Sequence, residues 1–138
     1  MAAIRVVVAE PDVEERRHIV EVVQAAAKDV GVQVSVAQAG DGTTALALCG
    51  DHRPRLLVAE VMLEGLSGLA LMRRVRAEFG GKTAVIFVTE MGRETDRYWG
   101  LRNGAHAYLA KPFDEASLRD RVRRVLTKGP DAQRDRPG

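Results

Sequence analysis

Four short apolar runs in this chain each end on a single polar residue. The runs and the residues that follow them are Val6–Ala9 before Glu10, Leu56–Ala59 before Glu60, Ala84–Val88 before Thr89, and Ala107–Ala110 before Lys111. Continuous apolar runs of this length are typical of parallel strands that helices cover on both faces. In an open sheet of this kind, ligands reach the protein at the carboxyl ends of the strands. We therefore expect two carboxylates, one hydroxyl and one ammonium to lie together there.

Segments with helical periodicity alternate with these runs. The expected helices cover residues 12–28, 42–49, 69–79, 94–103 and 114–127. A fifth strand is expected near residues 32–36, where Val32, Val34 and Val36 alternate with polar or small residues as in an edge strand. Five strand-like segments that alternate with five helical ones predict one doubly wound α/β domain.

The length of the chain and its single cysteine restrict its class. At 138 residues it can bury a sizeable core without metal or disulfide support. Cys49 is the only cysteine, which excludes an internal disulfide and is typical of a reducing compartment; it is expected to be a small core residue. No apolar window approaches the length of a membrane span. These features predict a cytoplasmic protein that does not enter a membrane.

Positive charge is concentrated at the carboxyl-terminal end of the chain. Residues 117–138 contain seven Lys and Arg against three Asp and Glu, although the whole chain has a net charge of only +2. Such an end could attract nucleic acid, but no aromatic side chains are interleaved for base stacking, so a solvated helix face and polar tail are favoured. The Gly, Pro and charged composition from Lys128 predicts a domain over residues 1–127 and a disordered basic tail over residues 128–138.

Three stretches carry a resemblance to a known family. They are Thr89 after an apolar strand, the sequence Gly104-Ala105-x-x-Tyr108-Leu109-x-Lys111-Pro112-Phe113, and the loop Val61-Met62-Leu63 to Ser67-Gly68. Together they resemble the receiver domain of two-component response regulators over about residues 4–127. Glu94-Thr95-Asp96-Arg97 with Trp99-Gly100-x-Arg102-x-Gly104 is most similar to single-domain receivers of type IV pilus chemosensory systems, which act in twitching motility. The resemblance implies a flavodoxin-like sheet with strand order 2-1-3-4-5.

The resemblance also implies roles for the polar strand ends. Receivers transfer a phosphoryl group from a histidine kinase to an aspartate that ends strand three, with Mg²⁺ held by that aspartate and an acidic pair that ends strand one. The aspartate position corresponds to Glu60 here, and the acidic pair corresponds to Glu10-Pro11, followed by Asp12. The family's threonine and lysine match Thr89 and Lys111, its aromatic switch matches Tyr108, and Lys111-Pro112 resembles its cis peptide junction.

Two departures from the family pattern predict that phosphoryl chemistry is impaired. Glu60 has one more methylene than aspartate and reaches roughly 1 to 1.5 Å further into the pocket, and a displacement near 1 Å can cost about a hundredfold in rate. Pro11 supplies no carboxylate for the octahedral oxygen shell that Mg²⁺ requires, which leaves Glu10, Asp12 and Glu60 as weak candidate ligands. We therefore expect no bound cofactor, weak or absent Mg²⁺ binding, and no enzymatic activity.

Two interpretations of the remaining pocket stay open. In one, Glu60 faces Lys111 and Thr89, imitates the phosphorylated state, and holds the Thr89 loop and Tyr108 in one arrangement without an incoming signal. In the other, the pocket is a relic without such a bias, Tyr108 is a simple core residue and Thr89 is a strand end.

The sequence thus predicts an atypical receiver that signals by phosphorylation-independent protein contact. The expected surface is the face of the fourth helix, fifth strand and fifth helix, with Tyr98 and Trp99 as candidate anchors. The partner would be a histidine kinase or a pilus or chemosensory component, and neither a membrane nor nucleic acid is expected. One alternative is a working phosphoacceptor that uses Glu60, Asp12 or Glu64. Another is the N-terminal part of a DNA-binding regulator whose output domain lies beyond Gly138.

Overall fold

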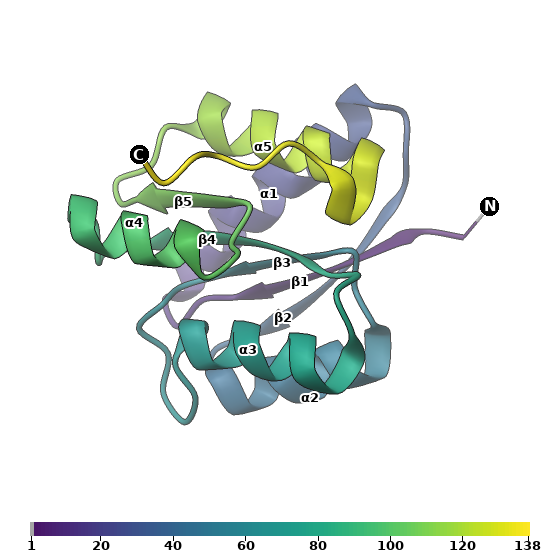
Figure 1. Ribbon diagram of the computed structural model, residues 1–138. Helices are drawn as coiled ribbons and strands as arrows, with labels where there is room; N and C mark the ends of the chain where they lie inside the picture. The colour runs from purple at the N-terminus through teal and green to yellow at the C-terminus, as the bar shows by residue number, and fades with distance from the viewer. Residues whose placement is uncertain (1) are drawn as a thin grey trace.

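The computed structural model describes residues 2–138, and they form one parallel sheet between two layers of helices (Figure 1). The strands are β1 Ile4–Ala9, β2 Val34–Ala39, β3 Leu56–Ala59, β4 Ala84–Thr89 and β5 Ala107–Ala110. The helices are α1 Val13–Asp29, α2 Gly42–His52, α3 Gly68–Phe79, α4 Glu94–Arg102 and α5 Glu115–Lys128, followed by a short 3-10 helix, η1 Gly129–Asp131. The sheet order is β2-β1-β3-β4-β5, which confirms the predicted fold class.

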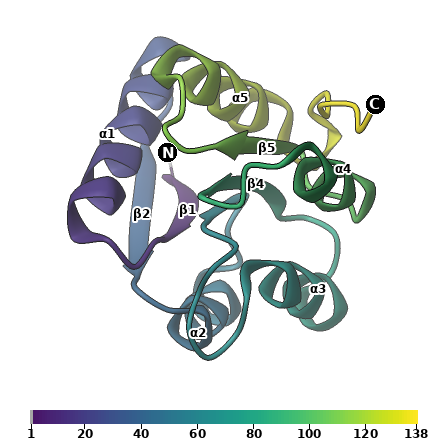
Figure 2. The same cartoon turned by 90° about the vertical axis from the view of Figure 1, so that its left-hand side faces the viewer.

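The two faces of the sheet have separate hydrophobic cores. Helices α1 and α5 cover one face, and α2, α3 and α4 lie on the other (Figures 1 and 2). Val6, Val8 and Val58 pack toward α1 and α5, whereas Val7 and Leu57 pack toward α2 and α3. Successive side chains of a strand point to opposite faces, so a run that is apolar at every position fills both cores. This arrangement leaves the polar residues at the carboxyl ends of the strands, beyond the two apolar cores.

Short polar side chains set where the helices begin. Asp12, Asp41, Ser67 and Asp114 each precede a helix and accept a hydrogen bond from the backbone N–H three residues later. Asp12 and Asp114 are thus the first residues before α1 and α5, close to where the sequence places these helices. Helix α2 continues beyond the expected end at Cys49 to His52.

Cys49 is fully buried, and burial raises the pKa of its thiol to about 12. It therefore belongs to the core, as expected. Within residues 2–138, no helix is both long enough and apolar enough to cross a lipid bilayer.

The segment after Lys128 differs from the predicted disordered tail. It turns through η1 and runs back along α5 and β5 (Figure 1). Ala132 is only 4% exposed and packs with the α5 core, and the Asp135 N–H donates to the His106 carbonyl at 2.8 Å. These contacts cannot be predicted from composition, because they depend on a few individual residues and not on average hydrophobicity.

Candidate functional site

The four polar strand ends meet at one edge of the sheet, the side that faces the viewer in Figure 2. Glu10, Glu60 and Thr89 are 2%, 4% and 0% exposed, and the Lys111 side chain is 7% exposed. The structure therefore brings together the two carboxylates, the hydroxyl and the ammonium that the strand ends predict. They are almost fully withdrawn from water, so their mutual contacts determine their charge states.

Lys111 is surrounded by three carboxylates. Its Nζ lies 2.6 Å from Glu10 Oε1, 2.9 Å from Glu15 Oε2 and 3.1 Å from Glu60 Oε1. Burial favours the neutral amine, but hydrogen bonds to Glu10, Glu15 and Glu60 outweigh it and raise the pKa of Lys111. Lys111 is therefore a permanent cation at the centre of the site.

Glu15 is the site residue that sequence reasoning missed. The sequence marks it only as an acid in the first turn of a helix, where the helix dipole favours negative charge. A usable signal was present, however, because α1 starts directly after the carboxyl end of β1. Its first turn is consequently next to the strand ends, and an acidic side chain there can reach Lys111.

Glu60 accepts four hydrogen bonds. Oε2 accepts from the Thr89 hydroxyl and from the Met62 N–H at 3.0 Å, while Oε1 accepts from the Glu90 N–H at 3.1 Å and from Lys111. Burial disfavours the charge on Glu60, but these four donors outweigh burial and lower its pKa. The carboxylate is thus ionised at neutral pH, and each oxygen already has two partners.

The residues after Glu10 do not complete a metal shell. The Asp12 N–H donates to Glu10 Oε2 at 2.9 Å, but the Asp12 carboxylate points to the start of α1 and accepts from the Glu15 N–H at 2.9 Å. Asp12 therefore does not supply the second carboxylate of the acidic pair, which is missing because position 11 is proline. Because Glu10 and Glu60 both converge on the Lys111 ammonium, the residues present do not fit Mg²⁺ unless Lys111 is first displaced.

A chain of hydrogen bonds leads from the site to Tyr108. The Thr89 hydroxyl, which donates to Glu60, accepts from the Met91 N–H at 3.1 Å, and the Met91 carbonyl accepts from the Tyr108 hydroxyl at 2.6 Å. Tyr108 is 4% exposed, and burial, with the negative charges of Asp96 and Glu60, raises its pKa to about 12. The ring packs so closely on α4 that a Cβ at Gly100 would lie 2.8 Å from Tyr108 Cε2.

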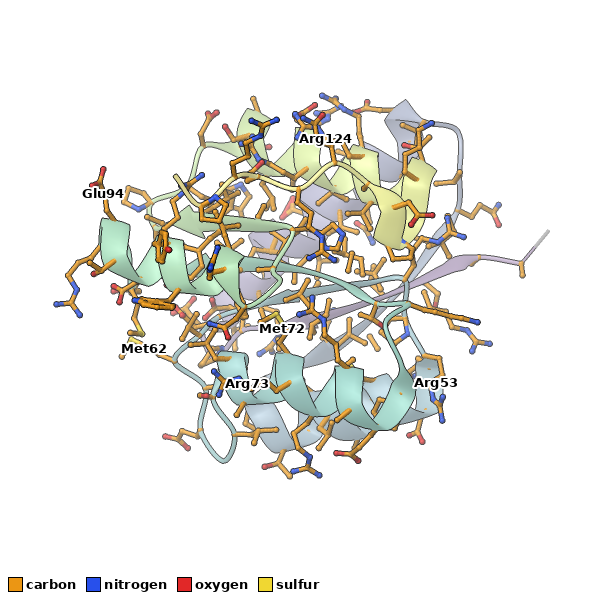
Figure 3. All side chains as sticks on the ribbon, in the orientation of Figure 1. Arg53, Met62, Met72, Arg73, Glu94 and Arg124 are labelled. Atoms are coloured by element: carbon orange, nitrogen blue, oxygen red, sulfur yellow. The ribbon has the colours of Figure 1, made fainter. Side chains whose placement is uncertain are left out.

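Tyr98 and Trp99 lie outside the site, on α4. Their rings meet edge to face with centroids 5.1 Å apart, and the residues are 38% and 57% exposed. Figure 3 shows Glu94, at the start of α4, and Met62, in the loop after β3, toward the side to which the strand ends open. Glu64, in the same loop as Met62, is exposed.

The chain matches the family model described as response regulator receiver domain over residues 12–123. It is 37% identical over 111 residues to the transcriptional regulatory protein DltR of Streptococcus agalactiae, covering 80% of this chain and 48% of that protein. It is 34% identical over 92 residues to protein PilH of Pseudomonas aeruginosa, covering 66% of this chain and 76% of that protein. The chain thus spans about half the length of DltR but most of PilH.

Solved receiver structures share the fold. The receiver domain of AraT from Geobacillus stearothermophilus superposes with a TM-score of 0.75 at 26% identity, covering 92% of this chain and 95% of that one. The receiver domain of a sensor histidine kinase from Pseudomonas aeruginosa, solved with a magnesium ion in its active-site cleft, gives 0.71 at 26% identity, covering 92% and 100%. From the family match, these relatives and the sheet order, we conclude that this chain belongs to the response regulator receiver domain family, a module of two-component signalling rather than a classical enzyme.

Proposed function

We propose that this receiver signals by protein contact without being phosphorylated, and that Glu60 holds its pocket in the arrangement that a phosphoryl group would impose. The observation that carries the proposal is the set of four donors on the Glu60 carboxylate, which includes Thr89 and Lys111. These two side chains match the threonine and lysine of the family site. Because the Glu60 carboxylate already contacts Thr89 and Lys111, a phosphoryl group would not need to move these two side chains.

The same contacts make Glu60 a poor phosphoacceptor. In-line attack on phosphorus needs a carboxylate oxygen with a free lone pair directed at the donor. Both Glu60 oxygens have two hydrogen-bond donors, and the residue is 4% exposed. Attack would require at least one of these bonds to break in a site where water cannot replace it, which adds to the barrier.

The chain through Thr89 and Met91 supports a fixed position for the aromatic switch. Glu60 accepts from the Thr89 hydroxyl, that hydroxyl accepts from the Met91 N–H, and the Met91 carbonyl accepts from the Tyr108 hydroxyl. If this chain couples the two residues, a change at Glu60 shifts the conformational equilibrium of Tyr108.

The proposed output surface is the face formed by α4, β5 and α5. The exposed Tyr98 and Trp99 pair on α4 supports it, because large aromatic side chains concentrate binding energy at protein interfaces. Similarity to PilH over most of that protein's length supports a single-domain receiver in a type IV pilus chemosensory system, with a histidine kinase or a pilus component as partner. The alternative, the receiver part of a longer DNA-binding regulator, is supported by the match to half of DltR.

Phosphorylation tests the first half of the proposal. Wild-type protein incubated with labelled acetyl phosphate and Mg²⁺ is expected to take up no stable label, and Glu60→Asp alone is expected to remain unlabelled. The double variant Pro11→Asp with Glu60→Asp restores both family carboxylates and is expected to take up label. Stable labelling of wild-type Glu60, located by mass spectrometry, would reject the proposal in favour of a working phosphoacceptor.

Glu60→Gln tests the second half. The amide keeps the size of the side chain but removes its charge and places a donor against the donors that now surround it. We expect the NMR signals of Thr89 and Tyr108 to shift or to broaden by exchange, because the chain between them loses its anchor. Unchanged Tyr108 signals in a folded Gln variant would support the interpretation of the pocket as a relic.

A further inference from the structure

The last ten residues lie on the molecule instead of leaving it. From the end of α5 the chain turns back and crosses beside β5 toward α4, as both ribbon views show (Figures 1 and 2). The Pro130 carbonyl lies 3.0 Å from His106 Nε2, and the Asp135 N–H donates to the His106 carbonyl at 2.8 Å. His106 directly precedes β5, the edge strand of the sheet. The segment is therefore anchored beside the start of the edge strand.

Asp135 fixes this segment to α5. Its carboxylate lies 3.1 Å from Arg121 Nε and 3.8 Å from Arg124 Nη1, and its side chain is only 10% exposed. Arg134 Nη1 donates to the carbonyl of Gly104, in the loop between α4 and β5, at 3.1 Å. The Asp135 carboxylate thus pairs with α5, while the Arg134 side chain and the Asp135 N–H bond to backbone carbonyls.

The end of the segment reaches the aromatic pair on α4. Pro137 and Gly138 line the same hollow as Tyr98 and Trp99. The segment therefore pairs with α5, bonds to the residue that precedes β5, and ends in a hollow that it shares with α4, so it lies along the proposed output surface.

We propose that residues 129–138 form an intramolecular strap on the α4–β5–α5 face, which a protein partner must displace before it binds. The inference depends on the proposed function in one respect, namely that this face is the output surface. A competing partner would bind as the strap does, through an extended segment with a carboxylate that pairs with Arg121 and Arg124. Because the strap is tethered, it acts at an effective concentration of the order of millimolar, so a modest intrinsic affinity is enough to keep it in place.

The strap is tested in the full chain with Asp135→Ala, and Asp131→Ala is the matched control. Both variants remove one acidic side chain from the same segment, but Asp131 is exposed, whereas Asp135 pairs with Arg121. The measurements are amide hydrogen exchange at residues 132 and 135, corrected for intrinsic rates, and acrylamide quenching of Trp99, the only tryptophan. Arg121→Ala removes the other partner of the pair and serves as a second variant.

We expect Asp135→Ala and Arg121→Ala to lower protection at both amides by about tenfold, as for the loss of a hydrogen bond to a charged group, and to increase the quenching of Trp99. The Asp131→Ala variant should resemble wild type in both measurements. Equal protection in Asp135→Ala and Asp131→Ala would overturn the strap. Trp99 is 57% exposed with the strap in place, so the strap covers it only in part. Lost protection with unchanged Trp99 quenching would show that the strap does not cover Trp99 at all, and would overturn its regulatory role. Neither measurement uses phosphorylation, so either failure is distinct from a failure of the acetyl phosphate experiment.

Discussion

Replacing Lys111 with methionine removes the cation that three carboxylates share. Methionine keeps the length of the side chain, so the change is mainly one of charge. Glu10 and Glu60 are 2% and 4% exposed and would lose the cation that they share, with only neutral hydrogen-bond donors left around them, whereas Glu15 is 41% exposed on its side chain and can turn to water. Removing one partner of a buried ion pair typically costs about 3 to 5 kcal/mol of unfolding free energy. We expect Lys111→Met to lower the unfolding free energy by an amount in that range at pH 7.

The loss should depend on pH in a defined direction. In the wild type, the pKa of Glu60 is held below its ordinary value of 4.5. The stability that its charge provides is therefore present above pH 4.5 and is lost only as the pH falls through the lower folded-state pKa. Without Lys111, Glu60 loses one of the four groups that lower its pKa, so its folded-state pKa should lie above the wild-type value. The deficit of the variant should then shrink as the pH falls and Glu60 binds a proton.

Urea unfolding of wild type and variant at several pH values measures this deficit. Lys82→Met, at an exposed position, is the control and should change the unfolding free energy by less than about 0.5 kcal/mol. Adding Glu60→Gln to Lys111→Met should recover part of the loss, since one buried charge then disappears with its partner. A deficit below about 1 kcal/mol at pH 7, or one that stays constant with pH, would refute the argument that Lys111 compensates buried charge.

Three further changes probe the path from the site to the tail. Thr89→Val removes a hydroxyl that both donates and accepts, and should lower the unfolding free energy by about 1 to 3 kcal/mol in urea titrations; no loss would mean that these bonds are unimportant. Gly100→Ala should cost about 1 to 3 kcal/mol and shift the ring signals of Tyr108, whereas Gly81→Ala, with open space around its Cβ, should do neither. Burial lowers the pKa of His106, so the stability from its neutral form is present above pH 6.5 and declines as the pH falls toward the folded-state pKa; an NMR titration midpoint at or above 6.5 would contradict this.

The sheet and the meeting of its strand ends could be predicted because both follow from a simple rule. A run that is apolar at every position must be buried on both faces, which requires helices on both sides and leaves only the strand ends for polar groups. Glu60, Thr89 and Lys111 therefore come together whatever the details of packing. Glu10 joins them for the same reason, because β1 lies beside β3.

The roles of the flanking acids could not be predicted in the same way. Asp12 and Glu15 are both acidic residues at the start of α1, and the sequence does not distinguish them. The backbone requires a cap at Asp12, so its carboxylate turns to the Glu15 N–H, while the rotation of the first helical turn directs Glu15 toward Lys111. That rotation depends on how α1 packs on the sheet, which involves residues distant in sequence.

The tail shows a second limit of sequence reasoning. Average composition describes residues 128–138 as polar and rich in Gly and Pro, which favours disorder. Two residues nevertheless make specific contacts: Ala132 is buried in a small apolar site, and Asp135 forms an ion pair with Arg121. Their effect depends on the position of α5 and is visible only when the helix is in place.

The four hydrogen bonds on Glu60 have a consequence for how long a signal would last. A phosphoryl group on a receiver is removed by hydrolysis, and the lifetime of that bond sets the duration of the response. The glutamate side chain is joined to the backbone by carbon–carbon bonds and cannot be hydrolysed away. Under the proposed function, the response would last as long as the folded molecule itself, and a cell could end it only by degrading the protein, halting its synthesis or occupying its surface.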